Sequence, residues 1–385
     1  MSHNKSLRYA TTGSWWKSLL LCLPMLIVML VMLTGGKPDM SDNVYCAALL
    51  TTVVFFAVLF YLMLYTGRTD RYRAIGFVVA AVMFALSFIT NLVAARGSMT
   101  FSNNEMLRCE IPFCHMVTTM IIIPAALKQT IIFPGQMTEG FASIGMMLVL
   151  VLGFSIVLGR GFCSWGCFYG GWDDGFSRLR RKSVVGRVNE AFKWFSFAML
   201  VYVALSAAAT LSPTYCDWLC PYKTITEYEA ITSTTVLIKT IVFLLLFVTL
   251  VVVLPLLTRK RIQCATFCPM GALLSLANKI NLFRIRTDHS KCVGCGRCNE
   301  ACPMLAMSRE HEACINCSKC GRCIDACPAG ALRYSIAGTR GRRHDTLSRT
   351  LFLYPAFGMM VVFLGSQLLK GLMLIFKLCI TGSLI

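Results

Sequence analysis

Long apolar blocks separated by short basic runs constrain this chain more than any other feature. A helix needs roughly 20 apolar residues to cross a bilayer. Blocks of about that length occupy 18–36, 44–66, 74–95, 140–159, 191–211, 235–257 and 351–369. Because 56% of the 385 residues are hydrophobic, the chain has too little polar surface for a soluble domain. We therefore expect an α-helical polytopic membrane protein with seven spanning helices.

A further apolar stretch, 108–135, is interrupted by Pro112, Pro124 and Pro134. Proline removes a backbone donor and breaks helices. Broken backbone is tolerated at membrane depth only where protein or a water-filled cavity satisfies its polar groups. The stretch is thus expected to form a re-entrant segment or half-helices and not to cross the membrane.

The basic residues predict how the helices are oriented. The net charge of +19 is spread over short runs beside the apolar blocks, at the N-terminus and within 67–73, 160–187 and 259–261. Such runs mark cytoplasmic loops, whereas a nucleic-acid-binding protein would gather them on one face. We expect a multi-pass protein of the bacterial inner membrane with a cytoplasmic N-terminus, and no nucleic-acid partner. Trp165, Trp172 and Trp218 are expected to anchor at the membrane interface.

Two cysteine runs dominate the one long polar segment. Residues 292–303 read CVGCGRCNEACP and residues 317–328 read CSKCGRCIDACP. Each is the C-x2-C-x2-C-x3-C-P pattern of bacterial two-cluster ferredoxins, in which the fourth cysteine ligates the other cluster. The pattern predicts two [4Fe–4S] clusters in a small α+β domain on the cytoplasmic side. The predicted ligands are Cys292, Cys295, Cys298 and Cys327 for cluster 1, and Cys317, Cys320, Cys323 and Cys302 for cluster 2.

Four further cysteine pairs lie at the ends of apolar blocks. They are Cys109/Cys114, Cys163/Cys167, Cys216/Cys220 and Cys264/Cys268. Each outer pair precedes a spanning block that ends in an inner pair, which is typical of a parallel internal repeat. If the two copies pack about a pseudo-twofold axis, Cys163, Cys167, Cys264 and Cys268 form an inner site. Cys109, Cys114, Cys216 and Cys220 would form an outer site, with a helix of about 30 Å between the two.

Several ligand assignments stay open at this point. Four thiolates suit an iron–sulfur cluster, copper or another tetrahedral metal, and the outer four could instead form disulfides. His115 follows Cys114 and either ligates metal, tunes a cluster or is hydrogen-bonded without a redox role. Cys314 is expected to be a non-ligand because no cysteine follows Cys320 at the required spacing.

Together these motifs resemble a known group. The runs GRGFCSWGC, CDWLCP and CATFCPMGA and the paired cysteine runs are similar to the NapH/NosR/CcoG group of membrane ferredoxins. The resemblance covers roughly 108–330 and departs from the pattern at Phe168, where the group has proline. It implies a polytopic protein that passes electrons to periplasmic reductases or reduces copper during oxidase assembly.

The expected organisation follows from these patterns. Residues 1–107 are an N-terminal three-helix membrane region, 108–187 and 188–275 are the two repeat units, 276–345 are the ferredoxin domain, and 346–385 are a membrane helix with an interfacial tail. The leading functional hypothesis is an electron relay from a cytosolic donor or quinol, through the cysteine-ligated centres, to a membrane or periplasmic acceptor. The alternatives are a copper-binding and copper-reducing assembly factor, or a structural maturation and anchor subunit of a larger reductase.

Overall fold

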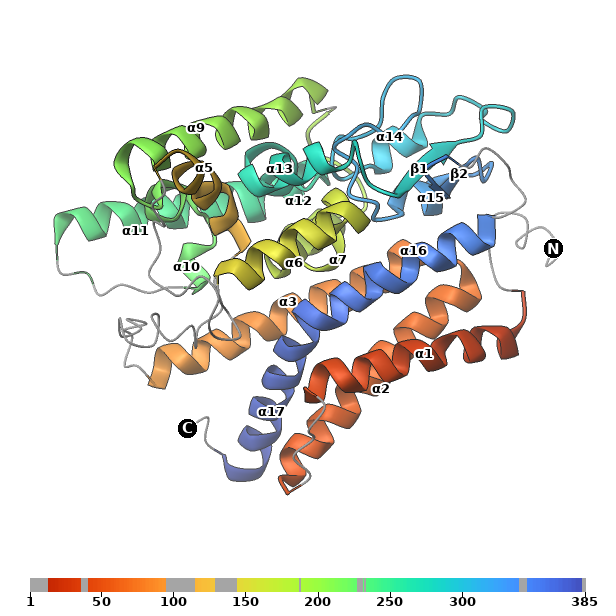
Figure 1. The fold of residues 1–385 in the computed structure, drawn as a ribbon, viewed down its shortest axis with the longest axis horizontal. Coiled ribbons are helices and arrows are strands. Elements are labelled where there is room, and N and C mark those ends of the chain that lie inside the picture. The colour runs from red at the N-terminus through yellow and green to blue at the C-terminus, as the bar shows by residue number, and fades with distance from the viewer. Residues whose placement is uncertain are drawn as a thin grey trace.

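The structure is a computed structural model that describes residues 13–35, 41–94, 115–128, 144–186, 188–226, 231, 233–338 and 345–382. The described part is mostly helical and carries a two-stranded sheet (Figure 1). Its longer helices are α1 (Trp15–Thr34), α2 (Asn43–Thr66), α3 (Thr69–Ala94), α5 (Thr118–Lys128), α6 (Ile144–Val157), α8 (Phe168–Leu179), α9 (Phe195–Thr210), α11 (Thr234–Leu246), α13 (Pro269–Ala277), α16 (Asp345–Met360) and α17 (Ser366–Thr381).

Five helical stretches are long and apolar enough to cross a membrane. They are Trp15–Thr34, Asn43–Thr66, Glu190–Thr210, Thr234–Thr258 and Asp345–Thr381. These coincide with five of the seven predicted blocks. The other two blocks correspond to α3 and to α6, which has 14 residues, and neither is among the five. The described part of the chain is therefore mostly helical with five candidate membrane spans, and the count of seven crossings stays a prediction.

The last stretch extends beyond the predicted block 351–369. It continues through the π-helical turn η8 (Val361–Gly365) and α17 to Thr381. Two of its glycines sit where neighbouring helices approach closely. A Cβ on Gly365 would lie 2.8 Å from Leu33, and one on Gly371 would lie 2.9 Å from Met83. The expected interfacial tail is thus largely a helix that packs on α2 and α3.

The proline-interrupted stretch is described from His115 to Lys128. It forms a short 3-10 turn, η1 (His115–Val117), followed by α5. An 11-residue helix is about 16 Å long and cannot cross a hydrocarbon core of about 30 Å. This part of the stretch therefore matches the expected half-helix, while 108–114 and 129–135 lie outside the described residues.

The ferredoxin domain is built around its two cysteine runs. Strand β1 (Phe283–Thr287) precedes the first run, and β2 (Leu332–Ile336) follows the second and pairs with β1 in antiparallel register. Each run ends in a one-turn helix, α14 (Arg297–Ala301) or α15 (Arg322–Ala326). These helices begin after Gly296 at φ 70° and Gly321 at φ 86°, backbone conformations that favour glycine.

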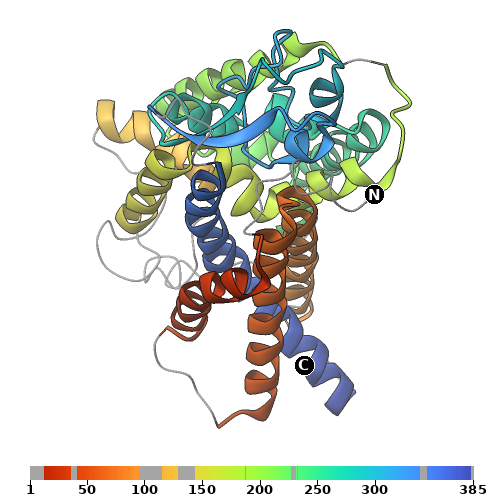
Figure 2. The ribbon, with the colours of Figure 1, turned by 90° about the vertical axis from the view of Figure 1, so that its right-hand side faces the viewer.

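The domain sits at one end of the helical part. In Figure 2 the sheet and the two short helices lie at the top, while α2 and α17 extend away from them. Aromatic rings fix the contact, since Phe352 of α16 stacks on Tyr334 at 4.5 Å and meets Phe283 edge-on at 5.5 Å. Such a small domain has little core of its own, so its clusters and this contact must supply much of its stability.

Candidate metal centres

The four predicted ligands of cluster 1 line one pocket. Cys292, Cys295 and Cys298 come from the first run and Cys327 from the second, as the crossed pattern requires. Cys295 is exposed, and the neighbouring Val293 is 70% exposed. The cluster 1 loop therefore reaches the surface of the described structure.

The predicted ligands of cluster 2 gather around a buried thiol. Cys323 lies close enough to interact electrostatically with Cys317, Cys320 and Cys302, and also with Cys298 of the first set. Cys302, Cys320 and Cys323 are buried. Cys314, the expected non-ligand, is not among the thiols that act on Cys323. The structure thus places the thiols of each predicted set near one another, with the second set deeper than the first, and their role as cluster ligands stays a prediction.

The four inner cysteines also converge. Cys167 interacts electrostatically with Cys163 and Cys268, and Cys264 interacts with Cys167 and Cys268. Cys163 lies in α7 (Phe162–Trp165) and Cys167 precedes α8, while Cys264 lies in the π-helical turn η6 (Gln263–Phe267) and Cys268 directly follows it. Two motifs far apart in the sequence therefore meet in one buried place, as the repeat predicted.

The second cysteine of each inner pair has the backbone of a ferredoxin ligand. Cys167 (φ −81°, ψ 107°) and Cys268 (φ −74°, ψ 115°) match Cys302 (φ −64°, ψ 114°) and Cys327 (φ −73°, ψ 116°). In three of the four cases a backbone N–H three or four residues later donates to the sulfur. These are Gly271 to Cys268 at 3.4 Å, Ala306 to Cys302 at 3.3 Å and Ala331 to Cys327 at 3.4 Å, whereas the N–H of Gly170 donates to the carbonyl of Cys167 at 3.0 Å.

These N–H···S contacts bear on what the inner site can hold. Hydrogen bonds to cysteine sulfur are one of the means by which proteins stabilise and tune iron–sulfur clusters. Phe168 does not disturb the turn, because it starts α8 as Pro269 starts α13. The inner four cysteines thus fit an iron–sulfur cluster by donor type, arrangement and hydrogen bonding.

Two soft side chains approach the inner cysteines from η1. His115 is buried, and its Nε2 lies 3.3 Å from Cys167 Sγ. Met116 Sδ lies 3.8 Å from Cys268 Sγ. The sequence left the role of His115 open, and nothing in it connected Met116 with the cysteines. In the part of the chain that the structure describes, no group of three or more Cys, His, Asp or Glu side chains is close enough together to hold a single metal ion. The same is true of the ferredoxin cysteines in this part of the chain.

The expected distance between inner and outer cysteines is wrong. Cys216 lies in the π-helical turn η4 (Tyr215–Leu219) and Cys220 directly follows it, and this turn lies beside η6 and not a full helix away. The Tyr215 hydroxyl accepts a hydrogen bond of 3.2 Å from Gln263 and interacts electrostatically with both Cys220 and Cys268. The reason is that η6 itself packs against α9, so the pair that follows α9 stays close to the inner motif. Cys109 and Cys114, the expected partners of this pair, lie outside the described residues.

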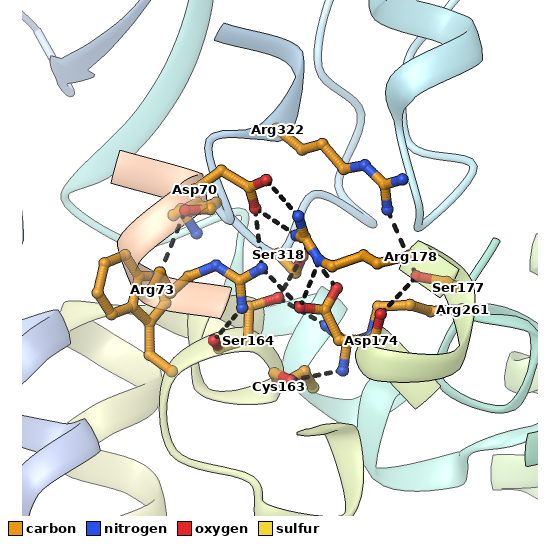
Figure 3. A network of polar contacts seen from close by, with 12 residues as sticks. Asp70, Arg73, Cys163, Ser164, Asp174, Ser177, Arg178, Arg261, Ser318 and Arg322 are labelled. Carbon is orange, nitrogen blue, oxygen red and sulfur yellow. Dashed lines mark hydrogen bonds and ion pairs between the residues drawn. The ribbon is translucent and has the colours of Figure 1, made fainter. Parts of the chain in front are cut away.

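A buried polar network joins the inner cysteines to the ferredoxin domain (Figure 3). Its central contact is a hydrogen bond of 2.8 Å between Ser164 Oγ and Ser318 Oγ. Ser164 follows Cys163, and Ser318 follows Cys317, a predicted ligand of cluster 2. Next to it, Trp165 Nε1 donates to the carbonyl of Lys319 at 3.3 Å. The loop around cluster 2 is therefore in direct contact with the loop around the inner site.

Ion pairs surround that contact. Arg73 Nη2 lies 2.9 Å from Asp70 and 2.9 Å from Asp174, and Arg178 bridges the same two carboxylates. Burial opposes ionisation of Asp174, but Arg178 and Arg73 outweigh it and hold the pKa of that carboxyl well below its ordinary value. These ion pairs thus connect helix α3 to helix α8 next to the ferredoxin loops.

Sequence reasoning missed three residues of this site. Trp165, expected at the membrane interface, is fully buried. Its ring packs on Phe352, and its N–H donates a hydrogen bond to the carbonyl of Lys319 in the cluster 2 loop. Arg160 and Arg261, counted as cytoplasmic loop charges, are fully buried beside the cysteines. A signal for both was present, since each arginine stands three residues before the first cysteine of an R-x2-C-x3-C pattern.

Comparison with known families agrees with these cysteine motifs. A family model described as "4Fe-4S binding domain" matches residues 285–308, which contain the first ferredoxin run. A second model with the same description matches three segments, 140–185, 192–230 and 240–287. Those three segments contain Cys163/Cys167, Cys216/Cys220 and Cys264/Cys268 in turn. The matches indicate [4Fe–4S] binding, and they do not select the particular group to which the sequence is similar.

Curated relatives cover part of the chain. A protein of Escherichia coli (strain K12) named "Putative electron transport protein YccM" is 24% identical over 46% of this chain and 50% of its own length. Uncharacterized proteins MJ0749 and MJ0750 of Methanocaldococcus jannaschii are 27% and 28% identical, over 50% and 46% of this chain. The chain thus spans half the length of the first of these relatives. No solved structure matches. Together the comparisons support a general electron-transfer role.

Proposed function

We propose that this protein is a membrane-bound electron carrier with two ferredoxin clusters and a further redox centre at the inner four cysteines. Bound iron–sulfur clusters would supply one-electron chemistry at these positions. The observation that carries the proposal is the Ser164–Ser318 hydrogen bond of 2.8 Å, which joins the loops of Cys163 and Cys317. The chain itself provides a continuous, water-poor contact between the two loops.

The burial of the cysteines supports an order for the centres. Cluster 1 lies at the surface, where Cys295 is exposed. Cluster 2 lies deeper in the structure, and side chains of the helical part donate hydrogen bonds to its ligand loops. Lys260 Nζ donates to the carbonyl of Cys302 at 2.8 Å, and Asn278 donates to that of Cys317 at 2.9 Å. Electrons would enter or leave at cluster 1 and reach the inner site through cluster 2.

Placement in the membrane and partners belong to the same proposal. We place the N-terminus and the ferredoxin domain on the cytoplasmic side of a bacterial inner membrane, with seven helices in the bilayer. The donor would be a cytosolic carrier or a quinol, and the acceptor a membrane or periplasmic redox protein. The short separation of η4 from η6 supports Cys216 and Cys220 as the next step outward, in a site completed by Cys109 and Cys114.

Iron counting and EPR on the full chain, purified without oxygen, test the inner centre. About eight irons per chain would mean that only the ferredoxin pair is filled, and about twelve would mean a third four-iron cluster. A third signal must be reduced through the ferredoxin domain, so replacing Ser164 by Val should slow its reduction without changing the iron count. Clusters that are present but never exchange electrons would instead support the structural anchor hypothesis.

One observation favours a second function, copper handling. Met116 Sδ stands 3.8 Å from Cys268 Sγ, and thioether and thiolate sulfur are ligands that Cu(I) prefers. Under this alternative the inner cysteines take copper as a substrate, and the ferredoxin domain reduces it. Copper bound by the iron-free inner site, and lost in Met116→Leu and Cys268→Ser, would favour this function over the relay.

A further inference from the structure

Two arginines occupy equivalent positions in the two inner motifs. Arg160 stands three residues before Cys163, and Arg261 stands three residues before Cys264. Both side chains are fully buried. Neither has a carboxylate oxygen within ion-pair distance among the described residues, although other buried arginines such as Arg73 do. Asp173 and Asp174 act on Arg261 from beyond that distance. Burying a guanidinium without a direct ion-pair partner costs several kcal/mol, so both charges favour a further anion at this site.

The contacts of the two arginines are reciprocal. Arg261 Nη2 donates to the carbonyl of Cys163 at 2.8 Å, and Arg160 Nη2 donates to the carbonyl of Cys264 at 2.7 Å. Each guanidinium thus crosses from its own motif to the first cysteine of the other. A serine completes each set, Ser164 for Arg261 and Ser275 for Arg160, both at 2.8 Å. Each pair of contacts holds the planar guanidinium against the opposite motif.

The two arginines also act on the thiols of the inner site. Arg261 Nη2 lies 3.2 Å from Cys264 Sγ, and the charges of both Arg160 and Arg261 act on Cys163. Burial raises the pKa of the Cys163 thiol, and the charges of Arg160 and Arg261 oppose that rise. The two arginines therefore favour the thiolate, which is the form that binds metal.

The missing partner is an anion of the right size. A [4Fe–4S] cluster with four thiolate ligands carries a net charge of about −2 when oxidised and about −3 when reduced. Two guanidinium charges within hydrogen-bond reach of its ligands balance the oxidised form and stabilise the reduced form still more. A nearby positive charge therefore raises the reduction potential.

We propose that Arg160 and Arg261 are a charge-compensating pair that sets the reduction potential of the inner four-cysteine centre. The proposal rests on the proposed function, in which this centre holds an iron–sulfur cluster. The arginines are positioning residues and do not ligate iron. Arg261 should contribute more than Arg160, because its Nη2 lies 3.2 Å from Cys264 Sγ and because its link to Ser164 lies on the contact with the ferredoxin domain.

Redox titration of the full chain, followed by EPR, tests the pair. Arg160→Gln and Arg261→Gln should lower the potential of the inner centre, with the larger shift in Arg261→Gln. Arg160→Lys and Arg261→Lys keep the charge and should recover part of the shift. Arg349→Gln is the control, because Arg349 is also buried and donates hydrogen bonds to Thr69 and to the carbonyl of Met63. Its inner centre should titrate like that of the wild type.

The outcomes separate this inference from the function on which it rests. A wild-type chain with about eight irons and no third signal removes the inner cluster and with it the proposed centre. A filled inner centre whose potential is the same in both Gln variants overturns the inference alone. Loss of the inner cluster from both Lys variants would also overturn it, because geometry and not charge would then be what the arginines supply. Loss in the Gln variants with retention in the Lys variants supports it.

Discussion

The ferredoxin domain and the inner cysteine site use the same cysteine turn in opposite settings. Cys302 and Cys268 share their backbone angles and an N–H···S contact. In the ferredoxin domain three of the four thiols of each cluster lie within one short run. In the inner site two pairs from distant motifs must be brought together by packing. Local spacing thus organises one kind of centre, and tertiary contacts through buried arginines organise the other.

Removing one inner thiol should separate the two regions most strongly. Cys163→Ser takes away one of four ligands of the inner site, so we expect loss of about four irons per chain with both ferredoxin signals retained. Iron and sulfide quantification with EPR measures both. The matched variant Cys327→Ser should remove cluster 1 and leave the inner centre. Loss of all clusters in Cys163→Ser would show that the ferredoxin domain cannot assemble without the inner site.

The contact between the regions should depend on one carboxylate. Asp174→Asn leaves the buried Arg73 and the partly buried Arg178 with half of their compensation, and breaking a buried pair such as Arg73–Asp174 costs about 3–5 kcal/mol. The free energy of unfolding in detergent measures this loss. Asp345→Asn is the control, since Asp345 pairs with Arg333 at the surface and should cost about 0–1 kcal/mol. Equal losses would mean that the network does not hold α3 to α8.

The lowered pKa of Asp174 also fixes the pH range in which this group affects stability. The folded pKa of Asp174 is lowered, so its contribution is present above the ordinary carboxyl pKa of about 3.9 and is lost only as the pH falls towards the lower folded value. Between pH 7 and pH 5 this group should therefore not change the stability of the wild type. A fall in stability over that range that disappears in Asp174→Asn would contradict the assignment.

What the sequence could predict follows the same division. The ferredoxin ligands were predicted by residue because their spacing is local, and the structure brings both sets together. The convergence of the inner cysteines was predicted from the repeat. The buried roles of Arg160 and Arg261 were not, because a basic residue beside an apolar block is usually a loop charge. The position of Cys216 was predicted wrongly, because the path of the chain after α9 depends on packing that no local pattern encodes.

The smallest expected effect concerns the symmetry of the inner site. A Cβ on Gly170 would lie 2.3 Å from Arg261 Nη2 and 2.6 Å from the carbonyl oxygen of Cys163, whereas one on Gly271 would lie 3.1 Å from both Arg160 Nη2 and the carbonyl oxygen of Cys264. A backbone oxygen cannot move aside as a flexible side chain can. Gly170→Ala should therefore cost about 1–3 kcal/mol in unfolding free energy.

Gly271→Ala should cost less than Gly170→Ala, because its neighbours need to give by only a few tenths of an ångström. The potential of the inner centre, read beside the unfolding free energy, should shift in Gly170→Ala, which displaces Arg261, and stay close to wild type in Gly271→Ala. Equal effects at the two glycines would mean that the halves are interchangeable. The pseudo-twofold repeat would then set the potential evenly, and the contact with the ferredoxin domain would not distinguish one arginine from the other.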